Sequence, residues 1–484
     1  MKKIITSLCV ILLSVPTLVS AQSRLEAHAV AVTLKDAILL ALRNNPGIKQ
    51  DEIERISEKF ALVVAKKQFE PRYQLDATAG YNTTTSGKTQ DFALTYSVSP
   101  TVTLENHYGT QFSVSATNPS SNGVYTPGAV LSVTQPLIRG FGKPFVEAAL
   151  NDALDTELVN KLNFKNSAIS IVAKVINDYL ALVQDYETLQ VDKQSLKNYK
   201  ETVSNDKALI AAGRMAKSDI VQAQAQVEQQ LATIENDYNS IYQARNTLLN
   251  DLGLPPYAAI TVPKRLNFRD MLKQLTGSTP LGSAEASEKI ALSNNIPYQA
   301  GIIAIRESNR ALLQARDKMH WKLNLTATED VGGGGTGNLV SLYNGSNHAE
   351  SVALNLSIPV DNVSDQSTLI QQEVGLDKAL IALKDTKRKL IETVGTDYRT
   401  IGTSRKSLSL SKSALKLQEE TVYIAQQKQL AGRVSTFEVL TNQKTLDTSQ
   451  VTVVQNQIAY LEAIVAYEQE LGVLLEPWHI KLRY

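Results

Sequence analysis

Few residues in this 484-residue sequence have the types and spacing that catalysis or metal binding requires. The five histidines are scattered, at His28, His107, His320, His348 and His479. None has a second histidine four residues away, as two zinc ligands on one helix face would. Ser86-Gly87-Lys88-Thr89 resembles the end of a phosphate-binding loop, but Asn82 stands where the first glycine is needed. We therefore expect no catalytic residue, no metal site and no cofactor. The net charge of +1, without a basic stripe, argues against nucleic acid as a partner.

The first residues indicate export. Two lysines precede an apolar run from Ile4 to Leu13, and Val19-Ser20-Ala21 supplies small residues for cleavage. The run is too short for a transmembrane helix and Pro16 interrupts it, so we predict a signal peptide over residues 1–21. The only cysteine, Cys9, lies within this segment. The exported chain is therefore expected to have no disulfide and no thiol nucleophile.

An apolar residue recurs every seven positions in one long stretch of the chain, at Val175, Leu182, Leu189, Leu196, Val203 and Ile210. A strict seven-residue period predicts a helix that packs against another helix with left-handed supercoiling. At about 1.5 Å per residue, residues 148–211 would extend roughly 95 Å, which is too long for a compact core. The same pattern returns 219 residues later, at Val394, Ile401, Leu408, Leu415 and Val422.

Other segments repeat as well. Ala431-Gly432-Arg433 matches Ala212-Gly213-Arg214 at the same offset of 219, whereas the strand-like residues of the two halves match at an offset of 250. The difference, 250 − 219 = 31 residues, places extra material in the first half, and we assign it to 82–125. An internal duplication of this size predicts two similar halves, each with a helix, a β hairpin and a long helical hairpin.

The predicted organisation follows from these repeats. The first repeat covers 22–254, with a β hairpin over 72–136 and a helical hairpin over 144–252. An equatorial connector, 255–283, leads to the second repeat, 284–475, with a β hairpin over 322–359 and a helical hairpin over 366–474. Residues 476–484 form a C-terminal tail. The predicted fold class is mostly α, with a β portion of four strands per chain.

The two β segments alternate between apolar and polar residues. Tyr73, Leu75, Ala77, Ala79 and Tyr81, for example, alternate with polar or small neighbours. Beyond the signal peptide the sequence has no run of about 18 apolar residues, so a β-barrel is the remaining way to span a membrane. Small membrane barrels need about eight strands, so four strands cannot close one. A barrel would therefore require several copies of the chain.

Several motifs carry a resemblance to a known family. They are Thr33-Leu34-Lys35-Asp36-Ala37, Asn44-Asn45-Pro46, the Gln135-Pro136-Leu137 exit from the strands, and the tandem halves. Together they resemble the TolC-like outer-membrane efflux proteins, or channel-tunnels. The resemblance implies a homotrimer with a twelve-stranded barrel in the outer membrane and an α-helical tunnel in the periplasm. It also implies a passive exit duct for an inner-membrane pump, joined through a periplasmic adaptor (membrane fusion) protein.

The resemblance also assigns roles to residues at two helix–helix turns. These turns, at Gly213-Arg214 and Gly432-Arg433, would form the periplasmic tip and contact the adaptor. Glu438 would line the pore constriction, and Asp219 is its counterpart in the first repeat. The second acidic position of the family falls on Thr441, so we do not expect a double ring of carboxylates.

Ordinary helix chemistry offers another explanation for the same residues. The spacing of Ser435 and Glu438 fits a capping box, and Asp219 suits a helix N-terminus. The two glycine–arginine turns fit glycine C-caps followed by a solvated cation. Both interpretations stay open from the sequence.

Two functions are compatible with the sequence. The first is the exit duct of a tripartite efflux or type I secretion system, located in the outer membrane and extending into the periplasm. The alternative is a periplasmic coiled-coil structural or adaptor protein without a barrel. The strand alternation favours the first, because an adaptor would be expected to carry one helical hairpin and a lipoyl-like β domain.

Overall fold

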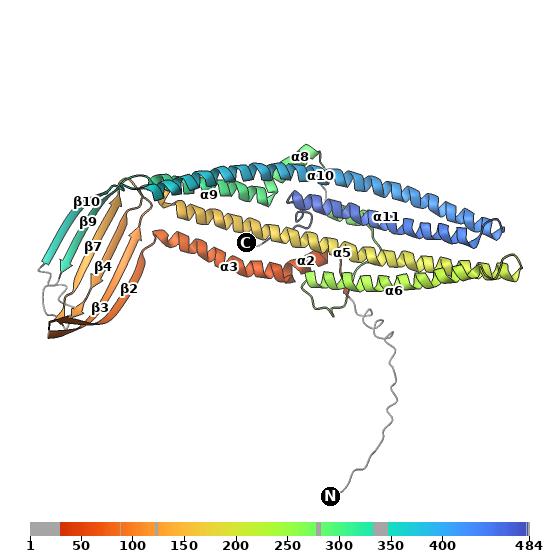
Figure 1. Cartoon of the computed structure of the whole chain (residues 1–484), viewed down its shortest axis with the longest axis horizontal. Coiled ribbons are helices and arrows are strands. Elements are labelled where there is room, and N and C mark those ends of the chain that lie inside the picture. The colour runs from red at the N-terminus through yellow and green to blue at the C-terminus, as the bar shows by residue number, and fades with distance from the viewer. Residues whose placement is uncertain are drawn as a thin grey trace, which may run out of the picture. The chain divides into compact units, whose positions relative to one another are not determined.

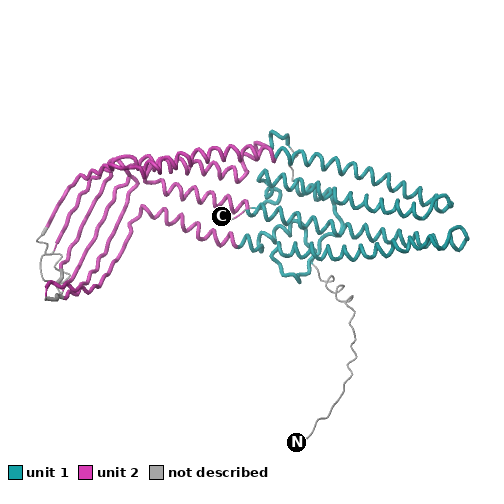
Figure 2. Tube along the Cα trace, viewed as in Figure 1, with its two compact units in different colours: residues 1–49, 167–287, 394–481 teal, residues 50–166, 288–393, 482–484 magenta. Residues whose placement is uncertain are grey.

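The computed structural model describes residues 30–87, 89–121, 124–276, 282–332, 347–480 and 482. The chain forms two compact units, and each unit combines stretches from both halves of the sequence (Figure 2). Unit 1 contains Met1–Lys49, Ser167–Ser287 and Val394–Lys481, and unit 2 contains Gln50–Asn166, Glu288–Thr393 and Leu482–Tyr484. The predicted signal peptide lies outside the described residues.

Two long helical hairpins dominate the chain (Figure 1). They are formed by α5 (Ala148–Ala211) with α6 (Ile220–Asp251), and by α10 (Val363–Leu430) with α11 (Thr436–Glu470). Most of the predicted heptad positions are buried: Val175, Leu182 and Leu189 are at most 3% exposed, and the first three of the second pattern at most 6%. The positions nearer the tips, Leu196, Val203, Ile210 and Leu415, are half-buried. The prediction of two long packed helices is confirmed.

α5 is the one described helix that is long and apolar enough to cross a membrane by length and composition. However, 56% of its most apolar 18-residue stretch is buried inside the protein. Its apolar residues are therefore used to pack against neighbouring helices.

Shorter elements join these hairpins. They are α2 (Leu34–Asn44), α3 (Pro46–Lys66), α4 (Lys143–Val146), α7 (Phe268–Thr276), α8 (Ala284–Asn294), α9 (Ile296–Lys318), a 3₁₀ turn at Lys67–Phe69, and the parallel pair β1 (Val30–Ala31) and β8 (Ile260–Thr261).

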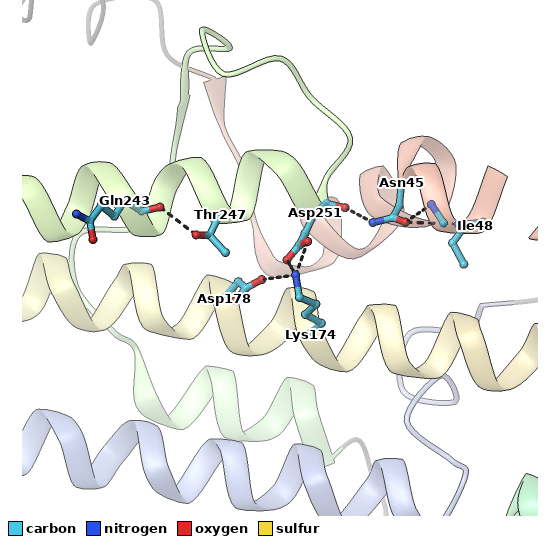
Figure 3. A network of polar contacts seen from close by, with 8 residues as sticks. Asn45, Ile48, Lys174, Asp178, Gln243, Thr247 and Asp251 are labelled. Atoms are coloured by element: carbon cyan, nitrogen blue, oxygen red, sulfur yellow. Dashed lines mark hydrogen bonds and ion pairs between the residues drawn. The ribbon is translucent and has the colours of Figure 1, made fainter. Parts of the chain in front are cut away.

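The break between α2 and α3 falls at the predicted Asn44-Asn45-Pro46. Figure 3 shows the polar contacts of Asn45 at this break. The Asn45 Oδ1 atom accepts the Gly47 amide at 2.8 Å, and its Nδ2 atom donates to the Asp251 carbonyl at 2.8 Å, at the C-terminal end of α6. The Asp251 carboxylate accepts a 2.5 Å bond from Lys174 of α5. One asparagine therefore caps α3 and satisfies a terminal carbonyl of α6, and the Asp251 carboxylate joins α6 to α5.

Unit 2 contains an antiparallel sheet (Figure 1). Its members are β2 (Arg72–Ser86), β3 (Thr89–Glu105), β4 (Gln111–Thr117), β5 (Ser120–Ser121), β6 (Val124–Tyr125), β7 (Gly128–Pro136), β9 (Lys322–Gly332) and β10 (Asn347–Ser357). The long strands are ordered β10-β9-β7-β4-β3-β2, and every neighbouring pair is antiparallel. β5 pairs with β3 in the same register as β4 does, so β5 continues the line of β4. The β5–β6 pair likewise has the same register as the β4–β7 pair, so β6 continues the line of β7.

The prediction of one hairpin in each β segment, and hence of four strands per chain, is wrong. The first segment holds four long strands and the second holds two, so the described chain has six. The extra residues assigned to 82–125 include β3 and the strand 111–121, which pairs with β7 in a second hairpin. Its strand 111–121 is interrupted before Ser120 because Pro119 has no amide hydrogen for the ladder. The turn into it is built by Asn106, whose Oδ1 atom accepts the amides of Tyr108 and Thr110 at 2.9 Å.

The sheet has one polar and one apolar face. A row of paired residues on the polar face reads Arg72, Thr103, Ser113, Ser132, Thr328 and Ser351. The neighbouring row on the other face begins Tyr73, Val102, Val114 and Leu131, and it ends in Glu329 paired with Glu350. The apolar side chains are uncovered in the single chain: Leu75 is 69% and Val352 is 75% exposed. This face needs an apolar environment.

Candidate functional site

The two predicted tip turns have the same backbone structure. Gly213 has a φ of +69°, and the amides of Gly213 and Arg214 donate to the carbonyls of Ile210 and Leu209 at 3.0 and 2.9 Å. The second turn repeats both bonds around Gly432, whose φ is +72°. These are Schellman C-caps, in which glycine adopts the left-handed conformation without steric cost. The glycine C-cap interpretation is therefore confirmed for both turns.

The two arginines of the turns differ in their contacts. The Nη2 atom of Arg214 donates to the carbonyl of Leu430, the last residue of α10, at 3.2 Å. This bond joins the tip of the first helical hairpin to the tip of the second. Arg433 is exposed, as a solvated cation would be. The matching sequences therefore do not give matching roles.

The two acidic tip residues also differ. Asp219 precedes α6 at the N-cap position, but its side chain accepts no hydrogen bond from the first turn. The capping bond expected for Asp219 is thus absent, because its backbone is already helical, with φ −75° and ψ −23°. At α11, Ser435 Oγ accepts the Glu438 amide at 3.3 Å. The return bond from Glu438 is not found among the described residues, so half of the predicted capping box forms and the Glu438 side chain is exposed.

Glu438 stands at the start of a stripe of hydroxyl side chains on α11. Thr441, Thr445, Thr448 and Thr452 follow at helical spacing, and each donates to the carbonyl four residues earlier at 2.7–3.0 Å. The stripe lines an open groove of about 410 Å³ between α10 and α11. Glu438 and Thr441 were predicted from the sequence as site residues, but the stripe was not, although the threonines recur there at three- and four-residue spacing. The threonines make this surface polar, with the Glu438 carboxylate at its end and the exposed cation Lys444 among the residues that line the groove.

Polar contacts connect α5 to α11 near the tips. Asp447 accepts bonds from Ser195 Oγ and Tyr199 Oη, both at 2.5 Å. Further toward the tips, Gln443 donates to Thr202 at 3.1 Å. The hydroxyl of Thr436 donates to Asp206 at 3.0 Å, and Gln429 of α10 donates to the same carboxylate at 2.9 Å. Near the tips, much of the contact between the two helical hairpins therefore consists of side-chain hydrogen bonds, which form only in a specific geometry.

Burial shifts the protonation of several helix carboxylates. It raises the pKa of Asp447 in spite of the two hydroxyl donors. Between α5 and α6, burial and then the charge of Asp192 raise the pKa of Asp237 to about 7. Asp192 itself accepts a 2.8 Å bond from Gln230.

These shifts predict that the first helical hairpin loses stability as the pH rises. An acid whose pKa is raised by folding contributes stability that is fully present below its unfolded pKa and is lost as the pH rises through the folded pKa. For Asp237 this loss occurs up to about pH 7. Hydrogen exchange, corrected for its intrinsic pH dependence, should show weaker protection of α6 at pH 8 than at pH 6. Asp237→Asn should reduce the difference, and an unchanged difference in this variant would contradict the assignment.

Comparison with known proteins places this geometry in a family. A family model described as "Outer membrane efflux protein" matches residues 37–254 and 289–473. A search of curated proteins finds no match. The outer membrane protein VceC of Vibrio cholerae is 15% identical, with a TM-score of 0.69 over 91% of this chain and 96% of VceC. The Neisseria gonorrhoeae MtrE outer membrane channel is 16% identical, with a TM-score of 0.68 over 91% of this chain and 88% of MtrE.

CusC, which forms a transmembrane channel, is 17% identical, with a TM-score of 0.68 over 91% of this chain and 92% of CusC. At these identities the structures show a common fold, which is the channel-tunnel fold of strands and long helices expected from the resemblance. The family model covers most of the sequence independently of them. The chain therefore belongs to the outer membrane efflux protein family.

Proposed function

We propose that three copies of this chain form the passive exit duct of a tripartite efflux or type I secretion system. The observation that supports this most strongly is the uncovered apolar face of a sheet that continues into long helices. An apolar face of this extent suits lipid, and the polar face of the same strands suits a water-filled lumen. A periplasmic adaptor without a barrel would leave the apolar face in water. The alternative function is therefore disfavoured.

In this proposal the hydroxyl stripe of α11 faces the lumen, and three copies of Glu438 surround the entrance. The exposed Glu438 carboxylate supports the assignment, since it is not held back by a capping bond. The threonine hydroxyls would present neutral groups to the cargo, with Lys444 as a cation beside them. Thr441, one helical turn beyond Glu438, would continue the same surface.

Glu438→Gln should reduce the preference of the open channel for cations by about twofold or more, because it removes three charges from the narrowest region. Thr441→Glu should have the opposite effect and increase block by divalent cations. Both can be measured as reversal potentials and single-channel currents in planar bilayers. Unchanged selectivity in both variants would place these residues away from the lumen.

The two tip arginines are proposed to contact the periplasmic adaptor. Arg433→Glu should reduce export of a pump substrate by about tenfold, by placing a negative charge at the contact, while leaving the trimer intact. Arg214→Glu should affect export and also loosen the tips, because Arg214 holds the Leu430 carbonyl. Lys217→Glu, at an exposed cation beyond the first turn, is the matched control. Full export by the Arg433→Glu variant would argue against the contact.

The function as a whole can be tested in cells that lack their own exit duct. Restored efflux, together with co-purification of an adaptor and a pump, would support it. Correct insertion in the outer membrane without any export or partner would contradict the tripartite role.

A further inference from the structure

The sheet of unit 2 ends in two long strands that each have one free edge. Within the described part of the chain, β2 pairs only with β3 and β10 pairs only with β9. β2 is 15 residues long and β10 is 11 residues long, which is enough to span a membrane at a tilt. Unpaired backbone amides and carbonyls are strongly unfavourable in lipid. In a membrane, therefore, both edges require a partner strand.

The strand directions select the partner. Six strands alternate in direction from β2 to β10, so the two edge strands run in opposite directions. β10 of one copy can therefore pair antiparallel with β2 of the next, and repetition closes a ring. Antiparallel pairing of β2 with β2 would instead need a two-fold axis in the membrane plane. That symmetry would place the helices of the two copies on opposite sides of the membrane.

The register across the sheet is also suited to a barrel. The row that starts at Arg72, the first residue of β2, reaches β10 at Ser351, six residues before the end of that strand at Ser357. The row thus shifts by about one residue per strand. With strands about 4.8 Å apart and about 3.4 Å per residue, this shift corresponds to a tilt of about 35°. Membrane barrels have tilts of about 35–45°.

We propose that each copy contributes all six strands, so that a trimer closes an eighteen-stranded barrel (3 × 6) in which β10 pairs with β2 of the neighbouring copy. This inference rests on the homotrimer of the proposed function. A twelve-stranded barrel would need two strands to leave the sheet. However, the hydrogen-bonded path from β2 to β10 passes through both β4 and β7.

The stagger and the two faces also predict the register between copies. The step from β10 to β2 of the next copy should bring the total shift to about seven residues. The total must be even, so it is six or eight, since an odd shift would place polar residues on the apolar face. Ser351 would then lie opposite Thr78 or Gly80 of the neighbouring copy. Equivalently, Asn355 would lie opposite Gln74 or Asp76. Eighteen strands at this tilt give a backbone diameter of about 34 Å, compared with about 22 Å for twelve strands.

The predicted absence of cysteine from the exported chain makes a disulfide test direct. The full chain carries Asn355→Cys with either Gln74→Cys or Asp76→Cys, and it is oxidised in outer membranes. One of the two pairs should link the copies into a covalent trimer on denaturing gels. The pair Ser113→Cys with Ser132→Cys, which lie opposite each other in β4 and β7, is the positive control within one chain.

A second measurement tests the position of the additional hairpin. A water-soluble maleimide should label Ser113→Cys about tenfold faster than Val114→Cys, because the first faces the lumen and the second faces lipid. Equal labelling, or trimers that do not cross-link in either register while the control pair oxidises, would overturn the eighteen-stranded barrel. The proposed exit duct would survive that result. Failure to form a membrane trimer at all would overturn both.

Discussion

Val98→Arg should prevent the protein from accumulating in the outer membrane, whereas Ser97→Arg should be tolerated. The two residues are adjacent in β3, but Val98 is on the apolar face, where it is 48% exposed and pairs with Ala77. Ser97 is on the polar face, within 3.2 Å of the Ser99 hydroxyl. An arginine on the lipid face of a membrane barrel costs about 2–4 kcal/mol near the midplane, and every copy in the ring would incur this cost. An arginine in a wide polar lumen can remain hydrated.

The measurement is the amount of heat-modifiable oligomer in outer-membrane fractions. Val98→Arg should reduce it by about thirtyfold or more, since the lower end of that cost, about 2 kcal/mol, corresponds to a factor of about thirty. Ser97→Arg controls for the effect of adding a long charged side chain to β3. Equal accumulation of the two variants would mean that the face bearing Val98 is not in contact with lipid.

The second large effect is expected from a buried ion pair in unit 2. Arg55 of α3 is 5% exposed, and its Nη2 atom lies 2.5 Å from Glu157 of α5. The bond to Arg55 holds the pKa of Glu157 below its usual value. Glu157→Ala would leave a buried guanidinium with only Glu58, which lies 2.5 Å from Nη1, as an ionic partner. Loss of one member of a buried pair typically costs about 3–5 kcal/mol.

Denaturant titration of the purified oligomer, followed by helical circular dichroism, measures this cost. Lys161→Ala is the matched control, because Lys161 contacts the same Glu157 at 3.5 Å from an exposed position and should contribute less than about 1 kcal/mol. Arg55→Met combined with Glu157→Leu should recover much of the stability, since no buried charge is left. A loss for Glu157→Ala no larger than that for Lys161→Ala would show that the pair is hydrated.

The features predicted correctly from the sequence depend on local chemistry. Most heptad residues of α5 and α10 are buried, and Gly213 and Gly432, both with positive φ, follow the ends of these helices. The break at Asn45 was predictable because the asparagine cap and the proline that follows it act on their own neighbours in the chain. Alternation of apolar and polar residues in the strands predicts which side chains lie on each face of the sheet, since successive side chains point to opposite sides.

The number of strands was missed because the 31 extra residues placed within 82–125 were not assigned to strands of their own. Local signals for a second hairpin were present: the turn at Asn106 and the dipeptide Asn122-Gly123, which is typical of two-residue hairpin turns. Asn122 and Gly123 lie outside the described residues, but Ser121 and Val124 on either side are paired.

The polar contacts of the helical tips could not be predicted in the same way. Tyr199 and Asp447 are 248 residues apart, and nothing local to either residue indicates the other. Asp219 and Glu438 occupy equivalent positions in the repeats, but of α6 and α11 only α11, which contains Glu438, has a serine cap. Sequence symmetry therefore predicted where the tips are but not how each residue is used.

The chain belongs to the outer membrane efflux protein family, and one face of its sheet is apolar and uncovered. We therefore propose that the sheet closes into a barrel only in a membrane trimer. Native mass spectrometry of the protein extracted from outer membranes tests this claim most directly. We predict the mass of three chains, stable only while detergent is present. A single chain that remains folded in buffer without detergent would contradict it.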